Sequence, residues 1–366
     1  MAYVISVFFI LTNQIFMFQR KHCKVIGVLF LVFCWMLFWS NDYNPDYTAY
    51  LMAFNKQLSY GYFEVGFIYL MKISKNIGMS YNVFLMFWSA IGLIFIHKTV
   101  ARYTDNYNLV YVLYFLMPFF FNTIIVRNFM VMAVFIYSTK YLLVDTRLSK
   151  IKYCLILLLA STIHAASFAY VPLVFLNVRK RNFFTTLLVI FSFLASFIVF
   201  FLNRNFNFII NIVQNTTIKQ IGIYLKSTAR FGFVIFWGAH IVNWAMAYIS
   251  LKSCAINIKA ITENQNVYDN IKFQFVRLNY FIHKVYFVLF PFMMVNSNFN
   301  RLLNNIMLLN YISIAITLRI IINKKERIRY IIALLIYIIF VFVYYSILNF
   351  NFVSRPILEN NIFVWS

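Results

Sequence analysis

Charged residues are scarce in this chain, and acidic residues are the scarcest of all. Of its 366 residues, 11% are charged and only nine are Asp or Glu, whereas 63% are hydrophobic. A soluble domain carries about 25% charged residues, so this composition excludes a water-soluble surface over most of the chain. The mean hydropathy of +0.78 agrees with an integral membrane protein.

Signals for metals, disulfides and nucleotides are also missing. The four cysteines (Cys23, Cys34, Cys154 and Cys254) form no CxxC pair, which argues against a disulfide or metal framework. His164 has no second histidine or acidic ligand at metal spacing, so we predict no metal and no cofactor. No P-loop, GxGxxG, HExxH or GxSxG stands in a usable context. An activated substrate must therefore come from elsewhere, for example from a lipid-linked donor.

Long apolar runs dominate what is present. A membrane span needs about 20 apolar residues, and buried spans can be shorter. Twelve runs qualify as candidate spans: 1–18, 25–40, 80–97, 107–123, 128–144, 151–163, 165–178, 182–202, 230–251, 273–295, 302–322 and 328–348. They predict an all-α, polytopic transmembrane helix bundle of about twelve spans. Because no long polar linker divides the chain, residues 1–366 are predicted to form a single membrane domain.

The basic residues orient these spans. The net charge is +23, and 19 of the 32 Lys and Arg residues fall in six short segments on one side of the twelve-span arrangement. The crowded side is predicted to be cytoplasmic, which places both termini outside. Basic residues spread in this way form no patch on a soluble domain, so nucleic acid is not a predicted partner. A basic cluster follows the first run rather than preceding it, so that run is interpreted as a retained helix.

Three loops stand out in this topology. The extracytoplasmic loops are predicted at 41–79 and 203–230, with short helices in them, and a cytoplasmic loop is predicted at 252–272. An apolar stretch at 63–75 inside the first loop is either a half-helix or a full span. The runs 151–163 and 165–178 form either a hairpin or one long helix. The hairpin keeps the following basic cluster on the cytoplasmic side and places His164 at its outer tip.

Arginines at membrane depth are costly and therefore informative. Arg127 lies between two apolar runs in NTIIVRNFMVMAVF, and Arg301 opens another run in NSNFNRLLNN. A guanidinium is planar and suits a phosphate or carboxylate; the alternative is an arginine that snorkels to the headgroups. Arg204, Arg230 and Arg355 share the outer side but lie in wetter loops.

Other polar residues on the outer side suit a sugar substrate. His164 is a candidate general base, or else a hydrogen-bonded core imidazole. Asp46 and Glu64 lie in the first outer loop with Tyr47 and other tyrosines. Carboxylates accept hydrogen bonds from sugar hydroxyls, and aromatic rings stack on sugar faces. The alternative is a solvated loop with interfacial tyrosines.

The order of these motifs resembles the EpsG family of Wzy-like polysaccharide polymerases. The chain presents DYxxY (Asp46, Tyr47, Tyr50), then ExGF at Glu64, FNTIIVRN with Arg127, and LASTIHAAS with His164. The resemblance covers roughly residues 40–180 and extends to the remainder by topology, where Arg301 fits the arginine that opens a late helix. The chain departs from the expected pattern where Asn128 replaces a Gln and Ala166 replaces a Ser.

The resemblance implies a metal-independent glycosyltransferase at the outer face of a bacterial cytoplasmic membrane. Its substrates would be glycans on undecaprenyl diphosphate, polymerised into capsule, exopolysaccharide or O-antigen. The implied site residues are His164 as general base with Glu64 as second choice, Arg127 and Arg301 on the diphosphate, Asp46 and Tyr47 on the sugar, and Arg230 as a further substrate-binding residue. A flippase and a chain-length regulator are implied partners, beside membrane lipids.

Three other activities compete with polymerisation. A flippase for the same lipid-linked oligosaccharide would need charges along a path and often internal repeats, and the sequence shows neither apart from Lys284. An O-antigen ligase type of transferase shares the Arg and His chemistry but uses a different acceptor. A glycan O-acyltransferase usually carries a second polar residue upstream of its membrane histidine, for which the chain offers no clear candidate.

Overall fold

A computed structural model describes residues 1–19, 23–56, 63–144, 146–179, 183–201, 232–261 and 270–363. Within these ranges the chain is helical and contains no β-strand. The predicted all-α polytopic bundle is confirmed. Its core is a large apolar cluster built from almost every helix.

The first half of the chain forms eleven described segments. They are α1 (Ala2–Met17), α2 (Lys24–Trp39), α3 (Tyr47–Phe54), α4 (Val65–Asn76), α5 (Tyr81–Tyr103), α6 (Tyr107–Tyr114), the π-helix η2 (Phe115–Phe119), α7 (Phe120–Ile124), α8 (Val126–Leu142), α9 (Arg147–Ser161) and the 3₁₀-helix η3 (Ala165–Phe175).

The second half of the chain is also a series of helical segments. Its segments are α10 (Phe183–Phe201), α13 (Phe233–Ile261), α14 (Ile271–Val285), η5 (Tyr286–Leu289), α15 (Phe290–Val295), η6 (Ser297–Phe299), α16 (Asn300–Ile320), α17 (Lys324–Val341), the π-helices η7 (Phe342–Ile347) and η8 (Phe350–Ser354), and α18 (Arg355–Glu359).

Polar side chains mark several helix starts. Ser80 accepts a hydrogen bond from the N–H of Val83 at the start of α5, and Asn106 accepts one from Leu109 at the start of α6. Each bond satisfies a backbone donor that has no partner inside its own helix. The Asn106 bond thereby fixes the start of α6 within a few residues of the end of α5, although both flanking runs are strongly apolar.

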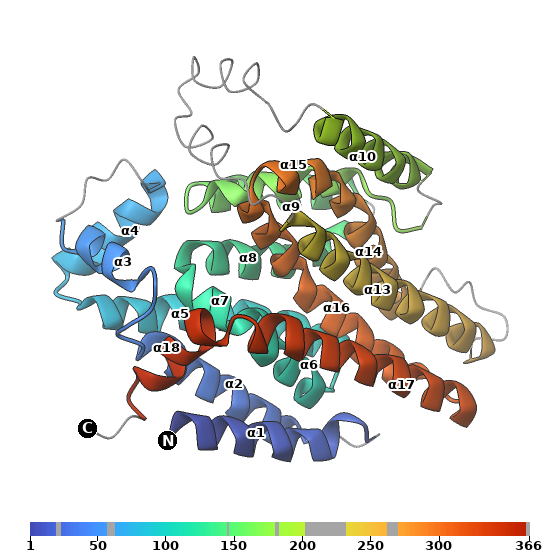
Figure 1. The fold of residues 1–366 in the computed structure, drawn as a ribbon, viewed down its shortest axis with the longest axis horizontal. Helices are drawn as coiled ribbons and strands as arrows, with labels where there is room; N and C mark the ends of the chain where they lie inside the picture. The colour runs from blue at the N-terminus through green and yellow to red at the C-terminus, as the bar shows by residue number, and fades with distance from the viewer. Residues whose placement is uncertain are drawn as a thin grey trace.

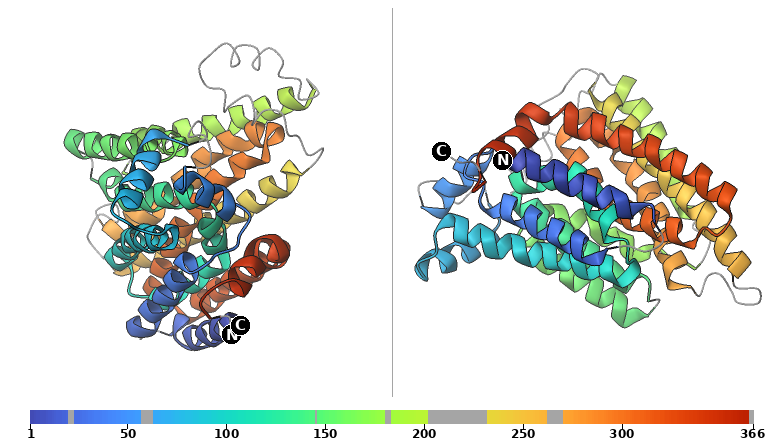
Figure 2. Two further views of the ribbon diagram at one scale, coloured as in Figure 1. Left: turned by 90° about the vertical axis from the view of Figure 1, so that its left-hand side faces the viewer. Right: turned by 90° about the horizontal axis from the view of Figure 1, so that it is seen from below.

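The long helices run back and forth between two ends of the molecule (Figure 1). One end holds α3, α4, α18 and the start of α1, and we call it the loop end. Tyr3 on α1 donates a hydrogen bond to Glu359 on α18 at 3.1 Å there, and Figure 2 shows the start of α1 close to α18. The opposite end holds the starts of α2 and α17, and we call it the basic end. Asp105 pairs there with Lys24 and Arg319.

Seven helical segments in the described part of the chain are long and apolar enough to cross a membrane. They are Tyr81–Tyr103, Tyr107–Ile124, Phe183–Phe201, Phe233–Ala260, Ile271–Val295, Ser297–Ile320 and Lys324–Ile347. Three further apolar helices are shorter: Ala2–Met17, Lys24–Trp39 and Ala165–Phe175. Every predicted span coincides with helix, while the count of twelve crossings stays a prediction. The chain is a multi-pass membrane protein.

The predicted hairpin around His164 is present. Helix α9 ends at Ser161, His164 itself has extended backbone angles (φ −157°, ψ 129°), and η3 returns along α9. The hydroxyl of Tyr153 on α9 donates to the carbonyl of Tyr170 on η3 at 2.7 Å and ties the two arms together. The tip of this hairpin, which includes His164, therefore lies at the loop end.

The described residues include parts of two of the three predicted loops. The cytoplasmic loop predicted at 252–272 is helical as far as Ile261, because residues 252–261 contain neither Gly nor Pro to stop α13. The first outer loop carries short helices as predicted, α3 and α4, and the apolar stretch at 63–75 forms α4 with 12 residues. The predicted outer loop 203–230 lies outside the described residues.

Candidate functional site

The ExGF motif fastens α4 onto the tip of the α9–η3 hairpin. The backbone N–H groups of Gly66 and Phe67 donate to the carbonyl of Thr162 at 2.8 and 3.3 Å. These are first-turn donors of α4 with no partner inside the helix. A Cβ on residue 66 would lie 2.7 Å from that carbonyl oxygen, so only glycine permits the approach.

This docking places the Glu64 carboxylate between two cationic or ionisable side chains. Its Oε1 lies 2.7 Å from Nδ1 of His164 and accepts from the backbone N–H of Ala165 at 3.0 Å. Its Oε2 forms an ion pair with the guanidinium of Arg127. We call Glu64, Arg127 and His164 the loop-end triad. Their side chains are 15–18% exposed, so they are shielded but reachable.

Aromatic rings hold the guanidinium of Arg127 in place. Its carbon Cζ lies 4.6 Å from the ring centre of Phe63 and 5.9 Å from that of Tyr50. Its Nε approaches the Tyr50 hydroxyl at 3.5 Å. Cation–π contacts of this kind strengthen where water is excluded. Arg127 therefore has a defined orientation, and its five N–H donors leave some for a further anion.

The surroundings keep Glu64 ionised. Burial by itself would raise the pKa of this carboxyl, but the hydrogen bond with His164, the charge of Arg127 and the Ala165 N–H outweigh it and lower the pKa to about 2. Because an ionised carboxylate only accepts hydrogen bonds, Nδ1 of His164 carries the proton in this contact. In the neutral ring, Nε2 is then left with a free lone pair. None of the described residues forms a hydrogen bond with it.

Asn128, which departs from the resemblance, supports the triad from inside the bundle. Its side-chain amide exchanges two hydrogen bonds with that of Asn305, at 2.9 and 2.8 Å, and Asn305 also donates to the Tyr170 hydroxyl at 2.6 Å. The Tyr170 ring stacks on Phe135 with 4.0 Å between centres. This network joins α8, η3 and α16 and begins at the residue that follows Arg127 in the chain.

A cavity of about 360 Å³ opens beside the triad at the loop end. Asp46 and Arg301 both line it, as does Ile125, two residues before Arg127. Burial raises the pKa of the Asp46 carboxyl, while the positive charges of Arg301 and then Arg127 oppose the rise. Asp46 thus lies within the electrostatic reach of both arginines, so the cavity and the triad are neighbours at the loop end.

Tyr47, an expected sugar-binding residue, forms its contacts elsewhere in the described structure. The hydroxyl of Tyr47 donates to Asn82 at 2.7 Å and its ring packs edge-on against Tyr81 at 5.4 Å, so Tyr47 anchors α3 to α5. Burial raises the pKa of this hydroxyl. Arg230 lies outside the described residues. Among the described residues, no three His, Cys, Asp or Glu side chains gather where they could hold a metal ion.

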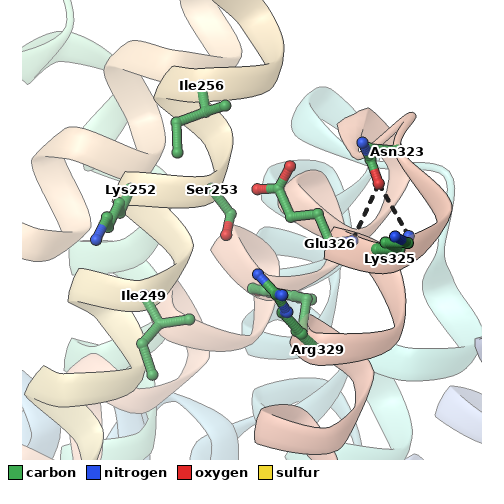
Figure 3. Close-up of a pocket in the computed structure, with 9 residues that line it drawn as sticks. Ile249, Lys252, Ser253, Ile256, Asn323, Lys325, Glu326 and Arg329 are labelled. Carbon is green, nitrogen blue, oxygen red and sulfur yellow. Dashed lines mark hydrogen bonds between the residues drawn. The ribbon is translucent and has the colours of Figure 1, made fainter.

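A second cavity lies at the basic end, far along the bundle from the triad. It has a volume of about 480 Å³ between the last turns of α13 and the start of α17 (Figure 3). Lys252, Lys325 and Arg329 line it together with Glu326, whose carboxylate accepts a hydrogen bond from Asn257 at 2.9 Å. Its basic lining agrees with the general crowding of cations at this end.

Comparison with known families decides what kind of protein carries this site. The model of the EpsG family matches residues 25–358. The chain belongs to the EpsG family. Its match spans both the triad and the Asp46–Arg301 cavity, and it extends the resemblance well beyond residues 40–180. No curated protein and no solved structure matched the chain. As an EpsG-family member, the chain is a multi-pass membrane protein associated with polysaccharide biosynthesis.

Sequence reasoning missed several residues of this EpsG-family site. Phe63 could not be recognised because it resembles every other apolar residue of the first loop. Asn304 and Asn305 could not be recognised because asparagine is abundant throughout the chain. A polar residue inside a predicted span was the available signal, and α16 carries Asn304, Asn305 and Asn310 in its buried stretch.

Proposed function

We propose that this protein is a polymerase that joins undecaprenyl-diphosphate-linked repeat units at the outer face of a bacterial cytoplasmic membrane. The observation that carries the proposal is the Glu64 carboxylate held between Arg127 and His164. The arrangement offers an oriented imidazole and a fixed cation side by side. Glycosyl transfer from a diphosphate needs both, a base for the incoming hydroxyl and positive charge for the leaving group.

The reaction balances with the groups present. The donor is a growing glycan on the lipid diphosphate, and the acceptor is a hydroxyl of a single lipid-linked unit. The hydroxyl oxygen forms a bond to the anomeric carbon of the donor while the bond from that carbon to the diphosphate oxygen breaks. Nε2 of His164 takes the hydroxyl proton, and the electron pair leaves with the diphosphate, whose charge Arg127 and Arg301 stabilise.

The geometry favours His164 over Glu64 as the base. Both Glu64 oxygens already accept hydrogen bonds, and a carboxyl with a pKa of about 2 is a weak base. Glu64 instead fixes the imidazole and would stabilise the imidazolium that forms when His164 accepts the proton. We therefore assign Glu64 a positioning role.

The glycan profile of cells that lack the gene tests the proposal. A polymerase defect leaves single lipid-linked repeat units on the outer leaflet and no long polymer. Units trapped on the inner leaflet would identify a flippase instead. A long polymer left on its lipid carrier would identify a ligase, and either of these results would overturn the proposal.

A further inference from the structure

Asn304 differs from its neighbour Asn305 in a way that points to a ligand. Both side chains are buried, with Asn304 only 6% exposed. Asn305 is fully engaged by Asn128 and Tyr170, whereas Oδ1 of Asn304 has no hydrogen-bond partner among the described residues. A buried polar atom without a partner costs about 1–3 kcal/mol. Asn304 lines the 360 Å³ cavity beside the triad, so a ligand there could supply the missing donor.

The cavity presents hydrogen-bond acceptors and aromatic rings around one cation. Asp46 contributes a carboxylate, Asn304 a buried amide, and Tyr344 and Phe352 aromatic rings. Arg301 lies one helical turn before Asn304 on α16 and therefore on the same face. The acceptors suit sugar hydroxyl groups, the aromatic rings suit the apolar face of a sugar, and the guanidinium suits a phosphate. Together they fit a sugar phosphate. The volume falls within the range of about 300–1,000 Å³ that is usual for small-molecule sites.

The wall opposite α16 has an unusual backbone. It is built from η7 and η8, two stretches of π-helix, a geometry that is rare and occurs frequently at functional sites. The side chain of Asn349 donates to the carbonyls of Tyr344 and Tyr345 at 3.2 and 3.3 Å. These bonds hold the widened wall in shape and keep the tyrosines and Phe352 at the cavity.

We infer that this cavity binds the sugar attached directly to the lipid diphosphate, and that Asn304 is a specificity-determining residue for that sugar. The inference rests on the proposed function, since it assigns a subsite within the same site. Oδ1 of Asn304 accepts a hydrogen bond from a hydroxyl or amide N–H of the sugar. Asp46 accepts from a second hydroxyl, and Arg301 binds the adjoining phosphate.

Binding of two short-chain probes to the purified, full-length protein in lipid nanodiscs tests this assignment. One probe is farnesyl diphosphate, and the other is farnesyl diphosphate that carries one N-acetylhexosamine. The wild type is expected to bind the sugar-bearing probe more tightly. Asn304→Leu, which keeps the side-chain volume but removes the acceptor, should reduce this preference roughly 2- to 10-fold, the value of one neutral hydrogen bond. Its affinity for farnesyl diphosphate should not change.

Two further variants keep the test decisive if Asn304→Leu fails to fold. Asn304→Asp retains an acceptor of the same shape and should retain the preference for the sugar-bearing probe. Phe352 is 78% exposed, so Phe352→Ala should fold normally, and it should weaken the preference. An unchanged preference in Asn304→Leu would remove Asn304 from sugar recognition. Equal affinity of the wild type for the two probes, or an unchanged preference in Phe352→Ala, would overturn the subsite while leaving the proposed polymerase standing. Binding of neither probe by the wild type would count against both.

Discussion

Nδ1 of His164 lies 2.7 Å from Oε1 of Glu64, although 100 residues separate them in the chain. The contact exists because α4 is fastened to the tip of the α9–η3 hairpin through Gly66 and Thr162. It fixes which nitrogen of the ring faces the carboxylate and leaves Nε2 without a partner among the described residues. Glu64 and His164 therefore work as a pair. Substitutions can separate the hydrogen bond that positions the ring from the ring nitrogen that would accept a proton.

His164→Asn should separate these two parts. The Asn amide can donate to Glu64 Oε1 as Nδ1 does, but it offers no base where Nε2 stood. We expect normal membrane levels and unchanged thermal unfolding, with polymer formation reduced about 10²- to 10⁴-fold, the usual contribution of a general base. Glycan ladders from cells that express the variant provide the measurement. A wild-type ladder from His164→Asn would remove His164 from the chemistry.

Arg127→Ala is expected to abolish polymer formation while leaving membrane insertion intact. The change removes a fixed cation from the leaving group, an effect that typically costs about 10²- to 10³-fold in rate. Arg127→Lys keeps the charge but loses the planar fork that meets Glu64 and a phosphate together, so it should also be impaired, by at least about 10-fold.

Arg355→Ala is the matched control for Arg127. Arg355 lies at the same end, is 54% exposed and pairs with Glu359 four residues on. Exposed pairs of this kind contribute about 0–1 kcal/mol, so polymer length and amount should stay at the wild-type level. If Arg355→Ala and Arg127→Ala lowered polymer equally, the effect would reflect the general charge of the loop end and not the triad.

Sequence reasoning reached the residues of the triad but not their bonds. Arg127 and His164 stood out because charge and imidazole are conspicuous beside apolar runs, and Glu64 because acids are so few. The Glu64 carboxylate binds both Arg127 and His164 because of how α4 packs on the hairpin. No local sequence pattern encodes this packing. Asn304 and Asn305 are chemically identical neighbours, and only packing decides that Asn305 is engaged and Asn304 faces the cavity. The end of α13 was missed because hydropathy falls near Lys252 while the helix continues.

Lowering the pH should reveal how much the ionised Glu64 carboxylate contributes to the stability of the protein. The pKa of this carboxyl is about 2 in the folded protein against an ordinary value of 4.5. Its contribution is therefore fully present above about pH 4.5 and is lost progressively as the pH falls toward about 2. Asp46, whose pKa is raised, acts in the opposite sense. The informative quantity is thus the difference in thermal stability between wild type and Glu64→Gln, which should shrink as the pH falls from about 4.5 toward about 2. A difference that does not vary between these pH values would show that the contacts of Glu64 with His164 and Arg127 are not formed.

Gly66→Ala should uncouple α4 from the hairpin without touching a charged group. The added methyl group would lie 2.7 Å from the Thr162 carbonyl oxygen, so α4 must shift and Glu64 must move away from His164. Overpacking of this kind typically costs about 1–3 kcal/mol, and polymer formation should fall with the loss of the Glu64–His164 contact.

Gly238→Ala on α13 is the matched control, because a Cβ there meets no atom within 4 Å. Alanine also favours helix over glycine by about 1 kcal/mol, so this variant should be as stable as the wild type or more so. Thermal unfolding in detergent and glycan ladders measure the two effects separately. Normal polymer from Gly66→Ala would mean that the triad forms without the close approach of α4 to Thr162.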